Sequence, residues 1–439
     1  MALTDRLHSP SVDLVVSGVL LWLLGAVAIW NAAAYPPIGG FDAREHIAYA
    51  HSLFESGGLP EGGASYTPPG FYVLAGAATE VGELIGLDEP ERAAQYLNAA
   101  LVFATGLLVL GLARLLFPGR PVVRWAALAF FVCCPVVLKT AAMFHPQPLA
   151  LFLSTLAFAV CVRMIVRRRY GWPEWVALAL TLAAAQLVRS VALWTVGVVL
   201  VALVAAAVAQ PEHRRRIVRA LAVAAAAVVL LPLPWYLHLQ STASNAVFGR
   251  GLSVLSFTNP WPAAFYLSPG LPDVIAEPHR ESLPPRFLPL LYVDAWGDYF
   301  GIWSWGAPRP ELTSAVNRRL VVQSVVGLPL TAVGVAGWFA LIGLAVARRR
   351  EAPALLVVAL APLAALAAVL YYATRGANTD GDIVKTMFLL PAVPFWALSF
   401  GFAVDTLLRR SRRAALPVLA ILSVCGAVCL SFATYAFVS

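Results

Sequence analysis

Lysine is almost missing from this chain, and charge of either sign is scarce. Only 12% of the 439 residues are charged, and the 31 basic residues include just two lysines, Lys139 and Lys385. Hydrophobic residues make up 60% of the chain, and the mean hydropathy is +0.77. Soluble proteins do not have this balance, so the chain is predicted to be an all-α polytopic membrane protein whose core is the helix bundle itself.

Several motifs that define common enzyme classes are also absent. The five cysteines lie in apolar stretches without a C-x-x-C pair, which argues against disulfides and structural zinc. G-x-G-x-x-G after a strand, the P-loop, H-E-x-x-H and G-x-S-x-G do not occur, so ATPase, zinc-protease and serine-hydrolase activities have no support. The net charge of +8 comes in short blocks beside apolar runs, which indicates orientation signals and no nucleic-acid partner.

Apolar windows long enough to cross about 30 Å of hydrocarbon recur along the whole chain. They predict about eleven transmembrane helices in one integral membrane domain, residues 1–439. The first window is too long for a signal-peptide core, so we expect it to be retained. The windows are 12–34, 91–113, 125–143, 147–164, 174–189, 191–209, 217–239, 320–346, 353–373, 384–407 and 415–437.

The basic residues set the predicted orientation. With the N-terminus in the cytoplasm, short inside loops hold 19 of the 31 basic residues, as the positive-inside rule requires. Residues 35–90 then form the first outer loop, and residues 240–319 form a large outer loop rich in Pro, Trp and Tyr. This predicts a multi-pass protein of the cell (inner or plasma) membrane with its polar chemistry on the extracytoplasmic face. The 19 residues are Arg6, Arg114, Arg120, Arg124, Arg163, Arg167, Arg168, Arg169, Arg214, Arg215, Arg216, Arg219, Arg348, Arg349, Arg350, Arg409, Arg410, Arg412 and Arg413.

The first outer loop carries an acidic cluster with a histidine. Apolar spacing predicts an amphipathic juxtamembrane helix over 41–56, and a Pro-Pro pair predicts the start of a second helix over 70–86. Asp42, Glu45 and His46 are spaced so that they share one face of the first helix. A partly desolvated carboxylate there could act as a general base, although Asp42 could instead simply cap the helix.

Polar residues from other segments could complete a site at the same membrane face. His145 and Gln147 lie in an outer turn, and Arg189 interrupts an apolar run where a phosphate would satisfy its guanidinium. Lys385, which follows Arg375, is a second candidate for binding phosphate. A structural turn histidine and a snorkelling arginine are the plainer explanations of His145 and Arg189.

Two further interpretations concern ligands. Asp42, His46 and His145 could supply the oxygen and imidazole ligands of a divalent cation, although the chain has no Asp-x-Asp pair there. The aromatic residues of 240–319 could stack on a sugar while Asp294 and Asp298 accept hydrogen bonds from its hydroxyls. An interfacial aromatic belt is the alternative explanation of those residues.

Together these motifs resemble the GT-C superfamily of membrane glycosyltransferases, which includes protein O-mannosyltransferases and the aminoarabinose transferases of lipid A. Bacterial members share an acidic motif in the first outer loop, a Pro-Pro-x-x-Tyr stretch, an outer His-Pro turn, a basic residue late in the fifth span and a Lys-led start to a late span. The matching residues are Asp42, His46, Ile47, Tyr49, Pro68, Pro69, Tyr72, Leu74, His145, Pro146, Arg189, Lys385, Leu389, Leu390, Pro391 and Ala392.

Two departures from the family pattern affect the assignment of roles. The acidic pair has become Asp42-Ala43, which places the base on Asp42 or Glu45, and an Arg-Tyr pair after Lys385 has become Met387-Phe388.

The resemblance implies a GT-C-like bundle and an inverting glycosyltransferase. The donor would be a polyprenyl-phosphate sugar, and the acceptor would be a hydroxyl of a glycan, lipid or protein. It implies that Asp42, Glu45 and His46 serve catalysis. The residues expected to bind the donor are Tyr66, His145, Gln147, Arg189, Arg375 and Lys385.

Two other classes of protein fit parts of the sequence. A transporter or lipid flippase could line a polar pathway with the same charges, but these gather at one face instead of the midplane, and no inverted repeat is visible. A non-catalytic scaffold could hold partners through residues 240–319.

Overall fold

The computed structural model describes residues 9–59, 63–243, 245–246, 249–250, 261–278, 286–297, 314–375 and 384–435. These residues are nearly all helical, and the strands among them are the two-residue, antiparallel β1 (Asn245–Ala246) and β2 (Gly249–Arg250). The fold is therefore all-α, as predicted.

The helices of the bundle and its connections, apart from short 3₁₀ and π-helical turns, follow one another along the chain in this order. The first half comprises α2 (Pro10–Ala34), α3 (Ala43–His51), α4 (Gly70–Leu84), α5 (Arg92–Leu116), α6 (Pro121–Cys133), α7 (Pro135–Ala141), α8 (Gln147–Arg167), α9 (Trp172–Val188) and α10 (Leu193–Ala209). The second half comprises α11 (Arg214–Leu230), α12 (Leu233–Ala243), α13 (Ala263–Leu267), α14 (Leu271–Ala276), α15 (Phe287–Trp296), α16 (Ser314–Ala347), α17 (Leu355–Arg375), the 3₁₀ segment η5 (Thr386–Ala392), α18 (Val393–Arg410) and α19 (Arg412–Phe432).

Eight helices among the described residues are long and apolar enough to cross a membrane, or nine if the bent pair α6 and α7 is one span. Every predicted window coincides with a helix or helix pair, but the predicted number of eleven is not confirmed. The difference lies mainly in α9 and α10, which have 17 residues each. At 1.5 Å per residue, such helices reach about 26 Å, less than the hydrocarbon thickness of about 30 Å.

A proline causes the break between α6 and α7. Pro135 cannot donate the hydrogen bond that would continue α6, and it pushes the preceding residue out of the helical region. Cys134 accordingly has φ −79° and ψ 108°, and the two helices meet at 57°. The bend turns the short α7, which carries Lys139, toward the end of the bundle where the outer turn at His145 lies.

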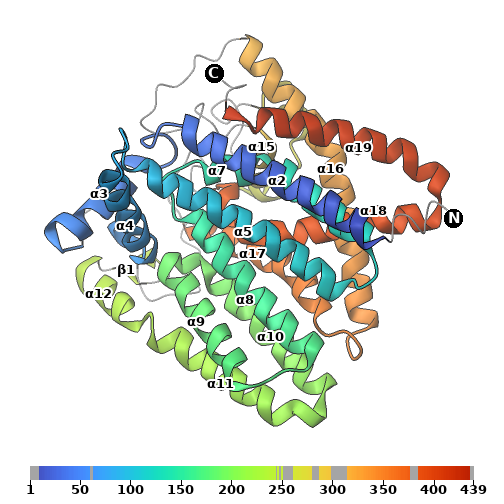
Figure 1. The fold of residues 1–439 in the computed structure, drawn as a ribbon, viewed down its shortest axis with the longest axis horizontal. Helices are drawn as coiled ribbons and strands as arrows, with labels where there is room; N and C mark the ends of the chain where they lie inside the picture. The colour runs from blue at the N-terminus through green and yellow to red at the C-terminus, as the bar shows by residue number, and fades with distance from the viewer. Residues whose placement is uncertain are drawn as a thin grey trace.

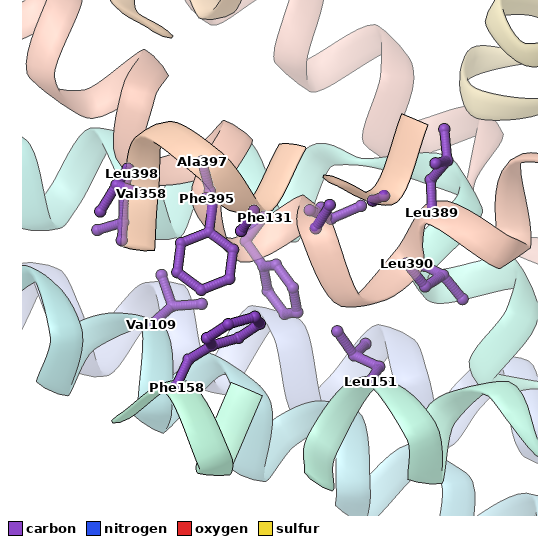
Figure 2. Close-up of a cluster of buried hydrophobic side chains, with 14 of the residues drawn as sticks. Val109, Phe131, Leu151, Phe158, Val358, Leu389, Leu390, Phe395, Ala397 and Leu398 are labelled. Atoms are coloured by element: carbon purple, nitrogen blue, oxygen red, sulfur yellow. The ribbon is translucent and has the colours of Figure 1, made fainter. Parts of the chain in front are cut away.

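The core lies where α5, α6, α8 and α18 meet. Figure 2 shows Phe131, Phe158 and Phe395 pointing toward one another in this core, and the rings of Phe158 and Phe395 meet edge to face with centroids 4.8 Å apart. The segment Thr386–Arg410, formed by η5 and α18, is the most buried of the spans. A helix that is apolar all round and covered on all sides belongs at the centre of a membrane bundle.

The two ends of the bundle differ in chemistry. α3 and α4 lie at one end, and the start of α2 lies at the opposite end (Figure 1). At that opposite end ion pairs join helix ends from distant parts of the chain, for example Asp13 with Arg124 (3.1 Å) and Asp405 with Arg120. The arginine-rich loops therefore share one end, while the membrane side of that end stays a prediction.

Both predicted juxtamembrane helices are present. The first is α3 followed by a π-helical turn over Ser52–Ser56, which together replace the expected helix over 41–56. The second is α4, which begins after Pro69 and ends at Leu84. A small apolar cluster that includes Tyr49, Phe71 and Phe144 packs these helices onto the ends of α5, α8 and α9.

Candidate active site

Asp42 lies just before α3 in an unusual backbone conformation. Its φ of 54° and ψ of 21° fall in the left-handed region, which asparagine and aspartate tolerate better than most other side chains. The side chain is half-buried and makes no capping hydrogen bond, while the carbonyl accepts from the backbone N of His46 at 2.9 Å. The conformation therefore turns the chain into α3 without using the carboxylate as a cap, so simple capping does not explain this residue.

His46 is buried against two tyrosines that belong to the same sequence motifs. The hydroxyl of Tyr72 lies 2.8 Å from Nδ1 of His46, and Tyr49 stacks on Tyr72 with ring centroids 3.8 Å apart. The hydroxyl of Tyr49 donates to the carbonyl of Thr67 at 3.2 Å. Burial raises the pKa of the Tyr72 hydroxyl, which keeps it protonated as a hydrogen-bond donor. The motif residues of the two juxtamembrane helices thus form one packed unit.

His145 meets His46 from the turn between α7 and α8. The two imidazole rings lie edge to face with centroids 4.7 Å apart. The amide nitrogen of Asn98 donates to the carbonyls of Met143 (2.9 Å) and His145 (3.0 Å), and Gln95 donates to the carbonyls of Tyr35 and Ala142. Both amides are fully buried near the start of α5. They hold the turn that carries His145.

The role of those two amides was not predicted from the sequence. Gln95 and Asn98 are polar residues three positions apart in an otherwise apolar window, so they face the same side of α5. Buried amides cost free energy unless they are hydrogen-bonded. Their spacing in an apolar span was the signal that could have identified them as hydrogen-bond donors to another segment, which is the turn at His145.

Two cations reach this unit from later segments of the chain. Arg189 follows α9 in an extended conformation, and its guanidinium carbon lies 5.4 Å from the ring centroid of Phe388. Nζ of Lys385 lies 4.2 Å from the ring centroid of Phe41, the residue before Asp42. Cation–π contacts of this kind orient a charged group without neutralising it. The departure at Phe388 therefore supplies a ring that packs on Arg189.

Burial keeps the two histidines neutral. His46 is 2% exposed, and burial, with smaller contributions from Arg189 and Lys385, lowers its pKa to about 3. Burial also holds the pKa of His145 well below its ordinary value, with further contributions from His46, Arg189 and Lys385. Arg189 and Lys385 therefore both lie within electrostatic reach of the two imidazoles. Because both imidazoles are uncharged near neutral pH, the positive charge of this cluster belongs to Arg189 and Lys385.

The three residues of the acidic cluster differ in burial: His46 is buried, Glu45 is exposed, and Asp42 is half-buried directly before the helix. The regular repeat of α3 begins at Ala43, so the spacing alone does not fix where the Asp42 carboxylate points, and a common face of the three stays a prediction. Tyr66, which is 53% exposed, lies within electrostatic reach of Arg189 and of both carboxylates.

The remaining predicted residues have different positions. Gln147 is the first residue of α8, is fully buried, and donates its backbone N–H to Nδ1 of His145 at 3.2 Å. Arg375 is the last residue of α17, and its side chain lies outside the described residues. Asp294 is buried and accepts from the backbone N of Thr386 at 3.3 Å, while Asp298 lies outside the described residues.

The geometry does not support the suggested divalent cation. Within the described ranges, no group of three or more His, Cys, Asp and Glu side chains is arranged to hold a metal ion. Nδ1 of His46 faces the hydroxyl of Tyr72, and Nδ1 of His145 accepts from the backbone of Gln147. Asp42, His46 and His145 thus do not form a ligand set among the described residues.

Comparison with known proteins places the fold. No family model matches the chain, and no curated protein matches its sequence. The oligosaccharyltransferase of Archaeoglobus fulgidus in its apo form matches with a TM-score of 0.61 at 12% identity, over 95% of this chain and 56% of its own. ArnT of Cupriavidus metallidurans bound to undecaprenyl phosphate matches with a TM-score of 0.54 at 17% identity, over 95% of this chain and 64% of its own.

A further structure of the archaeal protein, AglB in complex with an inhibitory peptide and a dolichol-phosphate, has a TM-score of 0.61 at 13% identity. Both proteins are GT-C membrane glycosyltransferases, so the chain has a GT-C-like fold. It spans less than two thirds of the length of each of these neighbours. At such low identities the likeness establishes the fold alone, and the activity requires a separate argument from the site.

Proposed function

We propose that this chain is an inverting glycosyltransferase that moves a sugar from a polyprenyl-phosphate carrier to an acceptor hydroxyl at the extracytoplasmic face of the cell membrane. The observation that carries the proposal is that Lys385 contacts the ring of Phe41, directly before Asp42, while Arg189 lies within electrostatic reach of His46 and Tyr66 at the same end of a GT-C-like bundle. A carboxylate and two cations from distant helices are costly to gather beside a membrane unless they have a function.

The cations suit the phosphate of the donor. Two solved structures with this fold hold dolichol-phosphate and undecaprenyl phosphate. Arg189 and Lys385 would bind the corresponding phosphate here and stabilise the negative charge that grows on it as the glycosidic bond breaks. Tyr66, His145, Gln147 and Arg375 complete the proposed donor-binding set.

The carboxylate suits the acceptor. Asp42 would take the proton of the acceptor hydroxyl as its oxygen attacks the anomeric carbon from the face opposite the phosphate. The new bond forms as the sugar–phosphate bond breaks, so the sugar is inverted and a free lipid phosphate leaves. Glu45 is the second acid near Tyr66, and neutral His46 supports the wall of the site beside the cations.

The test is the release of free lipid phosphate. Detergent-purified protein is incubated with a panel of radiolabelled polyprenyl-phosphate sugars and a membrane extract as acceptor source. Wild-type protein should release polyprenyl phosphate and transfer the label, which neither a transporter nor a scaffold would do.

Paired variants identify the residues responsible. Asp42→Asn should lower the transfer rate by about 10²–10⁴, the usual effect of losing a general base, while exposed Asp88→Asn should have no effect. Arg189→Ala should weaken donor binding by about 10–100-fold through the lost charged hydrogen bonds, with Arg168→Ala at the opposite end as its matched control. A normal transfer rate in Asp42→Asn would contradict the catalytic assignment. If wild-type protein released polyprenyl phosphate from none of the donors, the proposed function would be contradicted.

A further inference from the structure

The helix α15 belongs to the predicted outer loop 240–319, yet it is seated in the bundle. Nζ of Lys139 in α7 donates to the carbonyl of Gly297 directly after α15. The indole N–H of Trp296 donates to Oγ1 of Thr331 in α16 at 2.8 Å, and its ring meets Phe130 of α6 edge to face at 5.9 Å. Three helices of the bundle therefore anchor the end of α15.

From this position α15 holds the residue that follows Lys385. The backbone N of Thr386 donates to Oδ2 of Asp294 at 3.3 Å, and Oγ1 of Thr386 donates to the carbonyl of Leu291. Asp294 is 1% exposed and Thr386 is 5% exposed. Buried polar groups are costly to leave without partners, so this double contact fixes the start of η5 against α15.

The double contact acts on Lys385 through the backbone. Lys385 is extended, with φ −120° and ψ 128°, and it is the last residue before η5 begins at Thr386. Its ammonium group reaches Phe41 beside Asp42. A shift of Thr386 would therefore move the base of the lysine side chain and the charge at its tip.

We propose that Asp294 and Thr386 are positioning residues that hold Lys385 in place for the donor phosphate. Neither residue touches the reacting atoms. The inference rests on the proposed function in one respect, namely that Lys385 meets a lipid phosphate. It also gives α15, a part of the long segment 240–319, a defined role, which is to fix the backbone position of Lys385.

The scarcity of lysine makes the first test direct. Purified protein is treated with a small amine-acylating reagent, and mass spectrometry measures the modification of Lys385 and Lys139, the two lysines of the chain. Thr386→Val, which removes the hydroxyl contact, should raise the acylation rate of Lys385 about fivefold and leave Lys139 unchanged. Thr386→Ser keeps the hydroxyl and should restore the wild-type rate.

A matched control uses another buried threonine. Oγ1 of Thr155 donates to the carbonyl of Leu151 within α8 at 2.7 Å, away from η5. Thr155→Val removes the same group in a similar setting and should leave both lysines at their wild-type rates. If Thr386→Val raised the acylation rate of Lys139 as much as that of Lys385, the substitution would be loosening α15 in general. That result, or an unchanged acylation rate of Lys385, would overturn the proposal.

The second test measures binding of undecaprenyl phosphate. Thr386→Val should weaken binding about fivefold in the wild-type background and have no effect in a Lys385→Met background, because a positioning residue acts through the group it positions. Equal weakening in both backgrounds would overturn the proposal. If wild-type protein neither bound undecaprenyl phosphate nor released lipid phosphate from any donor, the proposed function would fail. The acylation rates alone would then decide whether Thr386 holds Lys385. Should Thr386→Val fold poorly, Asp294→Ala, which removes the acceptor of the Thr386 N–H, takes its place in both tests with the same expected and contradicting results.

Discussion

The backbone of Asp42 allows its catalytic and structural roles to be separated by three substitutions. Its φ of 54° lies in the region that Asn and Gly tolerate and that most L-residues avoid at a cost of about 1–2 kcal/mol. The carboxylate makes no capping hydrogen bond. The charge can therefore be removed without disturbing the turn into α3.

The expected magnitudes follow from that geometry. Asp42→Asn should leave the free energy of unfolding within about 0.5 kcal/mol of wild type, whereas Asp42→Ala should lower it by about 1 kcal/mol through strain at the left-handed position. All three substitutions, including Asp42→Gly, should lower the transfer rate by about 10²–10⁴. Stability should thus rank Asn and Gly above Ala, while activity should be lost in all three.

Two measurements on the same preparations check this prediction. Denaturant unfolding in detergent, followed by tryptophan fluorescence, gives the stability ranking, and release of labelled polyprenyl phosphate gives the rate. An Asn variant as unstable as the Ala variant would show that the carboxylate serves the fold. An Asn or Gly variant with substantial activity would show that another group, Glu45 first, is the base.

Three further predictions concern packing, pH and the bracket of the outer turn. Gly401→Val should destabilise the protein by about 1–3 kcal/mol, because a Cβ there would overlap the carbonyl oxygen of Val123 where α18 crosses α6; denaturant unfolding against Gly111→Ala, which faces open space, measures it. Lowering the pH from about 6 toward 4 should destabilise the protein, because the pKa of His46 is depressed to about 3 and the unfolded state then binds more protons; the slope should flatten in His46→Gln. Asn98→Ala should lower the free energy of unfolding by about 1–3 kcal/mol and reduce the transfer rate, because the buried carbonyls of Met143 and His145 lose their donor. A normal transfer rate in this variant would show that the turn at His145 does not need these hydrogen bonds.

The sequence predicted the helical fold well because membrane spans depend on long apolar runs. Each predicted window corresponds to a helix or helix pair, and the arginine-rich loops gather at one end. The number of spans was less predictable, since hydropathy does not reveal where Pro135 bends a helix or where a helix such as α9 ends short of the full thickness.

The sequence named the candidate site residues but not their arrangement. Residues 46, 145, 189 and 385 come from four distant segments, and the structure brings residues 189 and 385 within electrostatic reach of the two imidazoles. The left-handed backbone of Asp42 at the start of α3 was not predicted either, so the spacing did not fix where its carboxylate points relative to His46. Such a backbone state depends on packing and cannot be read from spacing.

Contacts between distant segments were beyond the reach of the sequence. The hold of α15 on Thr386 joins residues almost a hundred positions apart, and the bracket from Asn98 joins a span to a turn 45 or more residues later. Local patterns predict elements and faces, whereas these hydrogen bonds depend on which elements meet. The packing of Phe388 on Arg189 is another contact between distant segments. The sequence showed that Phe388 departs from the family motif, but not that its ring would lie beside Arg189.

A cryo-electron microscopy structure of the protein with bound undecaprenyl phosphate would show whether Arg189 and Lys385 hold the lipid phosphate beside Asp42. We expect the phosphate within about 4 Å of both the Arg189 guanidinium and the Lys385 ammonium, with the Asp42 carboxylate facing the same space. A phosphate bound at the arginine-rich end, or one that contacts neither cation, would contradict this expectation.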